Sequence, residues 1–157
     1  GLADVGGVWS LGTVTAILTE FADVSCALAL RAGLEGELKR GKLPGVTEGD
    51  LGSGAGMVVL AMGKMGAGEL NYSSDIDLIC LFDETRFERG DYPEVRAAFV
   101  RATKRMVAVL SDLSSEGYVF RTDLRLRPDP GVTPVCMSMA GAESYYESQG
   151  RTWERAA

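Results

Sequence analysis

Two apolar segments on either side of a glycine-rich turn constrain the fold of this chain most strongly. Residues 57–62 form a short, continuous apolar run that stops at Gly63, which is typical of a buried strand followed by a turn. Residues 75–82 form a second run, whose alternation places Asp75 and Asp77 on one face of an extended strand. We therefore expect two strands of one sheet, joined by a turn that ends beside two carboxylates.

Further apolar patterns predict helices around these strands and one more strand. Residues 118–126 alternate and predict the third strand, whereas residues 41–56 and 83–92 are polar and indicate exposed connections. The expected helices cover residues 10–39 with Gly41 as the stop, then the segment from Pro93 to residues 114–117, and then the residues from Ser138 onward.

These elements predict an α/β fold of the α+β kind, in which helices flank a small mixed sheet. A length of 157 residues fits a single domain. Within it we expect residues 1–40 to form an N-terminal packing helix, residues 57–127 to form the catalytic core and residues 138–157 to begin a C-terminal helical part. The chain begins without Met and its last residues keep a helical pattern, so we expect it to be part of a longer polypeptide.

Composition excludes several classes of function. The net charge of −6 gives no basic face for nucleic acid, and no apolar run is long enough to predict a membrane-spanning helix. The absence of histidine removes every Ser-His and Cys-His triad. Cys26, Cys80 and Cys136 are too far apart along the chain for a zinc motif or a disulfide framework. Without a secretory signal pattern, reduced thiols and a cytoplasmic location are expected.

Three acidic residues are the candidates for chemistry. Asp75 and Asp77 lie two residues apart on a strand, and two ionised carboxylates that close repel unless a cation lies between them. Asp123 lies in the next alternating segment and can complete the group from a neighbouring strand. Mg²⁺ or Mn²⁺ fits such oxygen ligands, and two such ions would serve a nucleotidyl-transfer reaction at a phosphate.

The spacing of these acids also fits interpretations other than a metal site. An Asp-x-Asp pair at the start of a strand is also typical of a turn or of a solvent-facing pair. A calcium-binding loop starting at Asp75 needs glycine at its sixth position and glutamate at its twelfth, where this chain has Cys80 and Arg86.

The glycine-rich turn before the acids is a candidate phosphate-binding site. It is not a P-loop, because Met65 follows Lys64 where that motif has serine or threonine. Its backbone N–H groups can still form an anion-binding nest. The candidate phosphate contacts are Gly63, Lys64, Ser73 and Ser74.

Two arginines lie close to the third acid. If residues 118–126 form a strand, alternation places Arg125 and Arg127 on the face of Asp123. They would either pair with Asp123 and other acids, or form a cationic wall that binds a phosphate.

The motifs resemble those of a known family. Residues 63–79, with the sequence GKMGAGELNYSSDIDLI, closely resemble the signature of bifunctional glutamine synthetase adenylyltransferase/adenylyl-removing enzymes. Residues 123–128 (DLRLRP) match a second signature of that family, and residues 153–155 (WER) match a third. The resemblance runs from about Ser10 to the end of the chain. It implies a polymerase-beta-type nucleotidyltransferase core whose metal ligands are Asp75, Asp77 and Asp123.

The resemblance also implies a reaction and partners. Family members carry one domain that uses phosphate to remove AMP from a glutamine synthetase tyrosine, releasing ADP, and another that attaches AMP from ATP. Residues 150–155 (GRTWER) resemble the amino-terminal, adenylyl-removing copy, whereas residues 128–133 depart from the family pattern. Glutamine synthetase is the expected partner, with PII-type signalling proteins as a further family expectation. ATP-dependent adenylylation and a non-catalytic nucleotide-binding regulatory module stay open as alternatives.

Overall fold

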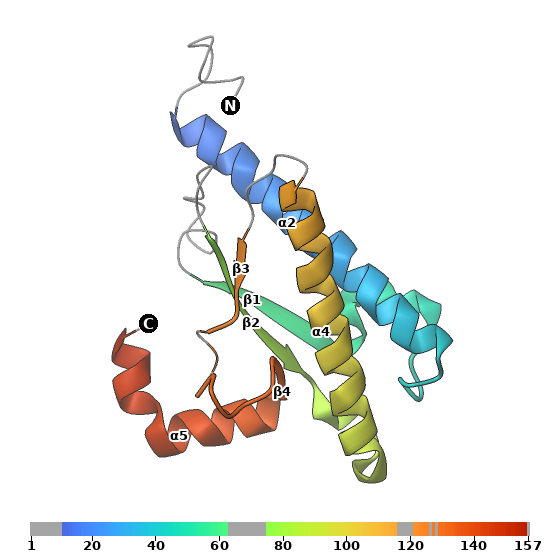
Figure 1. The fold of residues 1–157 in the computed structure, drawn as a ribbon. Coiled ribbons are helices and arrows are strands. Elements are labelled where there is room, and N and C mark those ends of the chain that lie inside the picture. The colour runs from blue at the N-terminus through green and yellow to red at the C-terminus, as the bar shows by residue number, and fades with distance from the viewer. Residues whose placement is uncertain (1–10, 63–74, 116–120, 126, 128, 157) are drawn as a thin grey trace.

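The computed structural model describes residues 11–62, 75–115, 121–125, 127 and 129–156. Its sheet is mixed: β1 (Met57–Met62) runs antiparallel to β2 (Asp75–Phe82), and β3 (Arg121–Asp123) and β4 (Cys136–Ser138) run parallel to β2. β3 pairs with the first part of β2 and β4 with its last part, so both lie along the edge of β2 opposite β1 (Figure 1). The predicted α+β class and the predicted strands 57–62 and 75–82 are confirmed.

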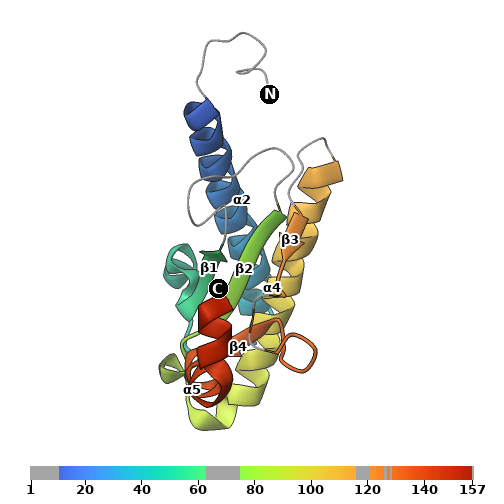
Figure 2. The ribbon, with the colours of Figure 1, turned by 90° about the vertical axis from the view of Figure 1, so that its left-hand side faces the viewer.

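Two long helices cover one face of this sheet. α2 (Leu11–Lys39) and α4 (Tyr92–Ser115) pack against each other on that face, whereas α5 (Met139–Ala156) lies on the opposite side (Figures 1 and 2). Helix α2 ends at the predicted glycine: Gly41 has a φ of 71°, its N–H donates to the Leu38 carbonyl, and the Lys42 N–H donates to the Glu37 carbonyl. This is the Schellman pattern, in which glycine adopts the left-handed conformation without a Cβ penalty.

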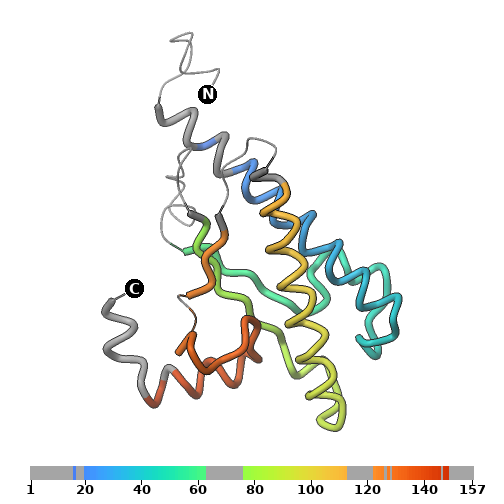
Figure 3. The backbone as a smooth tube through the Cα atoms, viewed as in Figure 1, coloured from blue at the N-terminus to red at the C-terminus, as the bar shows by residue number. Residues whose placement is uncertain are grey.

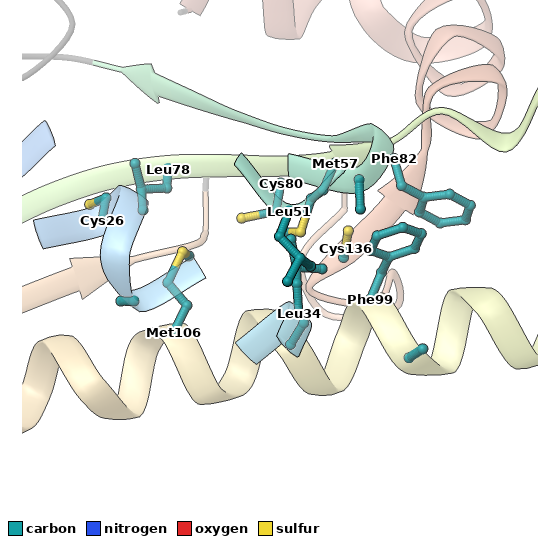
Figure 4. Packing of buried hydrophobic residues seen from close by; sticks show 14 of the residues in the cluster. Cys26, Leu34, Leu51, Met57, Leu78, Cys80, Phe82, Phe99, Met106 and Cys136 are labelled. Atoms are coloured by element: carbon teal, nitrogen blue, oxygen red, sulfur yellow. The ribbon is translucent and has the colours of Figure 1, made fainter. Parts of the chain in front are cut away.

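The hydrophobic core fills the space between the sheet and these two helices. Ile76, Leu78 and Cys80 on β2 are buried, as the alternation predicts, and they face α2 and α4. At one end of the core, the ring of Phe82 stacks on that of Phe99 with 4.9 Å between centroids (Figure 4). The even-numbered residues of β2 therefore point into the core, and the odd-numbered residues point to the other face of the sheet.

Helices α2 and α4 approach each other closely at Gly33. A Cβ atom added there would lie 2.7 Å from the backbone oxygen of Ala102, so only glycine fits without a shift. Nearby, the Glu37 carboxylate has a side chain that is only 8% exposed and accepts two hydrogen bonds from Arg101 of α4, at 2.6 and 2.9 Å. Glu37 also pairs with Arg40 at 3.3 Å. These contacts fix how the two helices cross.

The burial predicted for β1 is confirmed for the face that carries Met57, which is 4% exposed, and is wrong for the other face. Val58 and Leu60 are 37% and 42% exposed, because within the described chain β1 pairs on one edge only and the long helices cover only one face of the sheet. The connection 41–56 is not simply exposed either, since Leu43 and Leu51 join the core and residues 48–56 form 3₁₀ turns. The connection 83–92 likewise contains short 3₁₀ turns, at Glu84–Arg86 and Arg89–Asp91.

The third strand ends earlier than predicted. Of the predicted residues 118–126, the described strand β3 holds only Arg121–Asp123 and ends at Asp123. The helix expected from Ser138 begins at Met139, and the three-residue strand β4 before it was not predicted. The backbone trace in Figure 3 shows β2 and β3 running side by side, and their paired register ends with Asp77 and Asp123. No helix in the described residues has the length and apolarity to cross a membrane.

Candidate active site

Asp77 and Asp123 lie beside each other on adjacent strands. In the parallel pairing of β2 with β3, Asp77 is the direct partner of Asp123, and Asp75 is the partner of Arg121. Neighbouring strands are about 4.8 Å apart, and paired residues on parallel strands direct their side chains to the same face. Because Ile76 and Leu78 point into the core, Asp77 and Asp123 belong to the opposite face of the sheet, on the side where α5 lies.

The same face carries an apolar surface that the sequence did not indicate. The antiparallel register places Met62 opposite Asp77 and Leu60 opposite Ile79, so Leu60 and Met62 share the face of the acids. Leu60 is 42% exposed there, and Val58, two residues before it on the same face, is 37% exposed. Residues 57–62 are all apolar, so the alternation of buried and exposed side chains along β1 is seen only in the structure.

Several of the predicted site residues lie outside the described part of the chain. These are Gly63, Lys64, Ser73, Ser74 and the side chain of Asp75. Among the side chains that the structure does describe, no three acidic or cysteine residues gather closely enough to hold a metal ion. The triad of Asp75, Asp77 and Asp123 therefore stays a prediction, and the structure supplies the placement of two of its members.

Asp123 ends its strand by bonding to the residue two positions on. Its Oδ1 accepts the backbone N–H of Arg125 at 2.8 Å, a local turn that competes with the strand ladder. The Arg125 guanidinium then closes a fork on the same carboxylate, with Nη2 at 2.7 Å from Oδ2 and Nε at 3.0 Å from Oδ1. These side-chain and backbone hydrogen bonds lower the pKa of Asp123 below its ordinary value, so the carboxylate is anionic at neutral pH.

Arg127 has a different set of partners. Its guanidinium donates to the backbone carbonyls of Leu124 at 2.7 Å, Pro130 at 2.8 Å and Thr133 at 3.4 Å. The prediction that strand alternation places both arginines on the face of Asp123 is wrong in its premise, because the strand ends at Asp123. Of the two, Arg125 binds the acid, and Arg127 holds the loop that follows it.

The side chains of this site suit a hard divalent cation. Its described donors are carboxylate oxygens, which Mg²⁺ and Mn²⁺ prefer, on the face of the sheet opposite α2 and α4. Asp123 already attracts a cationic group, Arg125, in a bidentate geometry. Asp77 and Asp123 are therefore the described candidates for holding such an ion, and at Asp123 the ion would meet the Arg125 guanidinium.

The cysteines take no part in this site. All three are buried, and burial raises the pKa of the Cys26 thiol to about 11 and that of the Cys80 thiol to about 12. The pKa of Cys136 is raised for the same reason. Thiols held in this protonated state are poor nucleophiles and metal ligands at neutral pH, so the three cysteines are not candidates for the chemistry of this site.

Comparison with known proteins identifies the family. The family model for glutamate-ammonia ligase adenylyltransferase matches residues 1–157. The chain belongs to this family. It is 51% and 52% identical over 156 residues to proteins of Bradyrhizobium sp. strains ORS 278 and BTAi1, and 49% identical to one of Rhodopseudomonas palustris strain CGA009.

Each of these relatives is named a bifunctional glutamine synthetase adenylyltransferase/adenylyl-removing enzyme. The matches cover 99% of this adenylyltransferase-family chain but only 16% of each relative. The chain therefore spans about a sixth of the length of the relatives that it matches. The acids of β2 and β3 lie within this shared region.

Proposed function

We propose that this chain is a polymerase-beta-type nucleotidyltransferase core that removes AMP from an adenylyl-tyrosine of glutamine synthetase. Phosphate would attack the adenylyl phosphorus, the tyrosine oxygen would leave, and the product would be ADP. The observation that carries the proposal is the direct pairing of Asp77 with Asp123 on the face of the sheet opposite α2 and α4. The names of the relatives supply the substrate protein.

Asp77 and Asp123, together with Asp75, would hold one or two Mg²⁺ or Mn²⁺ ions. When bound, such ions neutralise charge on the reacting phosphate and orient it for in-line attack. The role of the protein is to fix the acids: strand pairing sets the position of Asp77, and the turn at Arg125 sets that of Asp123. Preorganised groups of this kind lower the barrier because they need no rearrangement during the reaction.

The groups on the turn and after β3 would bind the phosphates. Gly63, Lys64, Ser73 and Ser74 would supply backbone and side-chain donors, as the sequence predicts. Arg125 would supply a guanidinium that matches phosphate oxygens. Its side chain is 81% exposed, which leaves it accessible to a substrate that approaches the two acids.

The test is release of ADP from adenylylated glutamine synthetase in the presence of phosphate and Mg²⁺. Asp77→Asn and Asp123→Asn should each lower the rate by at least about 100-fold, since each removes charge that the transition state requires. Asp129→Asn is the matched control, because Asp129 is exposed and its φ of 42° suits asparagine equally well. ADP release at the wild-type rate by the Asp123→Asn variant would refute the proposal.

The names of the relatives also support a second candidate function, attachment of AMP to the tyrosine, because these names include adenylyltransferase activity. The same acids would then transfer AMP from ATP to the tyrosine. Incubation with labelled ATP and unmodified glutamine synthetase distinguishes the two directions. Binding of nucleotide without product in either assay would instead indicate a regulatory module.

A further inference from the structure

Arg125 already uses the carboxylate oxygens that a divalent cation at Asp123 would need. Nε lies 3.0 Å from Oδ1 and 3.1 Å from Oδ2, and Nη2 lies 2.7 Å from Oδ2. The backbone N–H of Arg125 adds a contact of 2.8 Å to Oδ1. A carboxylate offers about four lone-pair positions, so these four contacts take up most of its accepting capacity. A cation that binds Asp123 must therefore share or displace the guanidinium.

The two partners of this ion pair differ in how firmly they are held. The Asp123 side chain is 19% exposed and lies beside Asp77 in the sheet, whereas the Arg125 side chain is 81% exposed. Ion pairs that involve a solvent-exposed arginine are weak, because solvent screens the charges and the long side chain loses freedom on pairing. Arg125 can therefore leave while Asp123 keeps its position, since the contact from the backbone N–H does not depend on the guanidinium.

We infer that Arg125 is an exchangeable counter-ion of Asp123. In the metal-free protein it neutralises the carboxylate; a divalent cation displaces the guanidinium, which then becomes available to a phosphate oxygen of the substrate. This inference rests on the proposed function, because it assigns Asp123 to the metal. It makes Arg125 a positioning residue in one state and a phosphate ligand in the other.

Arg127 provides an internal comparison for this exchange. Its guanidinium binds three backbone carbonyls of the loop after β3 and has no hydrogen bond to Asp123 among those described. Its charge still lies close enough to contribute to the lowered pKa of Asp123. A variant of Arg127 therefore removes a nearby positive charge but keeps the hydrogen bonds from Arg125 to the Asp123 carboxylate. Comparing it with an Arg125 variant shows whether Arg125 competes directly with the cation or acts only through its charge.

The test is a titration with Mn²⁺, in which free Mn²⁺ is measured by electron paramagnetic resonance. The Arg125→Gln variant should bind Mn²⁺ about 2- to 5-fold more tightly than the wild type, because the competing cation is gone. Arg127→Gln should change the affinity less. Arg125→Lys should fall between the wild type and Arg125→Gln, since lysine keeps the charge but lacks the fork.

Arginine side-chain NMR gives a second readout, independent of activity. On addition of Mg²⁺ to the wild type, the Nε–H resonance of Arg125 should shift along the same binding curve, and that of Arg127 should not. Suppose that the wild type binds a divalent cation and Asp123→Asn does not. If the Arg125 resonance then fails to shift, or if Arg125→Gln binds Mn²⁺ no more tightly than Arg127→Gln, this inference is overturned and the proposed function stays intact. If the wild type binds no divalent cation, both proposals fall.

Discussion

The crossing of α2 and α4 can be tested with two glycines of the same helix. Gly33 lies at the crossing, where a Cβ atom would be 2.7 Å from the backbone oxygen of Ala102. Gly36, one turn further along α2, has no atom within 4 Å of the corresponding Cβ position. The two positions thus share a helix and differ in what surrounds them, so Gly36→Ala is a matched control for Gly33→Ala.

The expected difference follows from opposing contributions. Replacing glycine by alanine inside a helix stabilises the protein by about 1 kcal/mol at either position. At Gly33 the new methyl group must also push a backbone carbonyl aside, and overpacking of this kind costs about 1–3 kcal/mol. Gly36→Ala should therefore raise the free energy of unfolding by about 1 kcal/mol, and Gly33→Ala should leave it unchanged or lower it by up to about 2 kcal/mol.

Urea unfolding followed by circular dichroism measures both variants under one set of conditions. The two free energies of unfolding should differ by about 1–3 kcal/mol, which corresponds to a difference of several degrees in Tm for a chain of this size. If both variants are stabilised equally, α2 and α4 do not meet at Gly33 and the arrangement of the core described above is wrong.

Three further predictions follow from the described contacts. Glu37→Gln should lower the free energy of unfolding by about 1–3 kcal/mol, because it weakens the hydrogen bonds that the buried Glu37 carboxylate accepts from Arg101. Glu35→Gln should change it by less than about 0.5 kcal/mol, because Glu35 forms only an exposed pair with Lys39. Equal effects of the two variants in urea unfolding would contradict this. Hydrogen bonds from the backbone and side chain of Thr47 lower the pKa of Asp50 below its ordinary value of 3.8. The Asp50 carboxylate therefore stabilises the folded protein above pH 3.8, and this stabilisation is lost as the pH falls through the lower pKa of the folded state. An acid titration of Asp50→Asn should accordingly show a shallower loss of stability below pH 3.8 than the wild type. A thiol reagent at pH 8 should modify native protein slowly and unfolded protein rapidly, and rapid reaction of the native protein would contradict the burial of Cys26, Cys80 and Cys136.

The sequence predicted the elements whose signals are long and local. Helices α2 and α4 repeat apolar residues over many turns and β2 alternates over a full strand, so periodicity alone was sufficient to predict these elements. It did not predict the buried face of α2, because Phe21, Val24 and Leu28 of its apolar repeat are exposed. Strand β4 is only three residues long, from Cys136 to Ser138, and is held by pairing with β2 rather than by a pattern of its own. No local signal could have indicated it.

Properties set by tertiary partners were predicted less well. Whether Val58 and Leu60 are buried depends on which face of the sheet the helices cover, and residues 57–62 carry no information on this. The end of β3 depends on a hydrogen bond from Arg125 to Asp123, which competes with the alternation of the following residues. The close contact that requires glycine at position 33 involves a helix far away along the chain.

In the candidate site, too, the sequence predicted local features better than contacts between distant residues. The residue types and the spacing of Asp75 and Asp77 indicated paired carboxylates on a strand. That Asp123 lies directly beside Asp77 depends on parallel pairing between strands that are distant in sequence, which the sequence suggested but could not specify. The fork between Arg125 and Asp123 was one of two interpretations, and the structure shows that pairing.

The position of bound Mn²⁺ tests the central claim most directly. Mn²⁺ broadens the NMR signals of nuclei close to it, so substoichiometric Mn²⁺ should selectively broaden the backbone amide signals of Asp77 and Asp123, and Asp123→Asn should weaken this effect. Broadening centred instead on other acids such as Asp50 or Asp83, or no selective broadening, would contradict a metal site formed by β2 and β3.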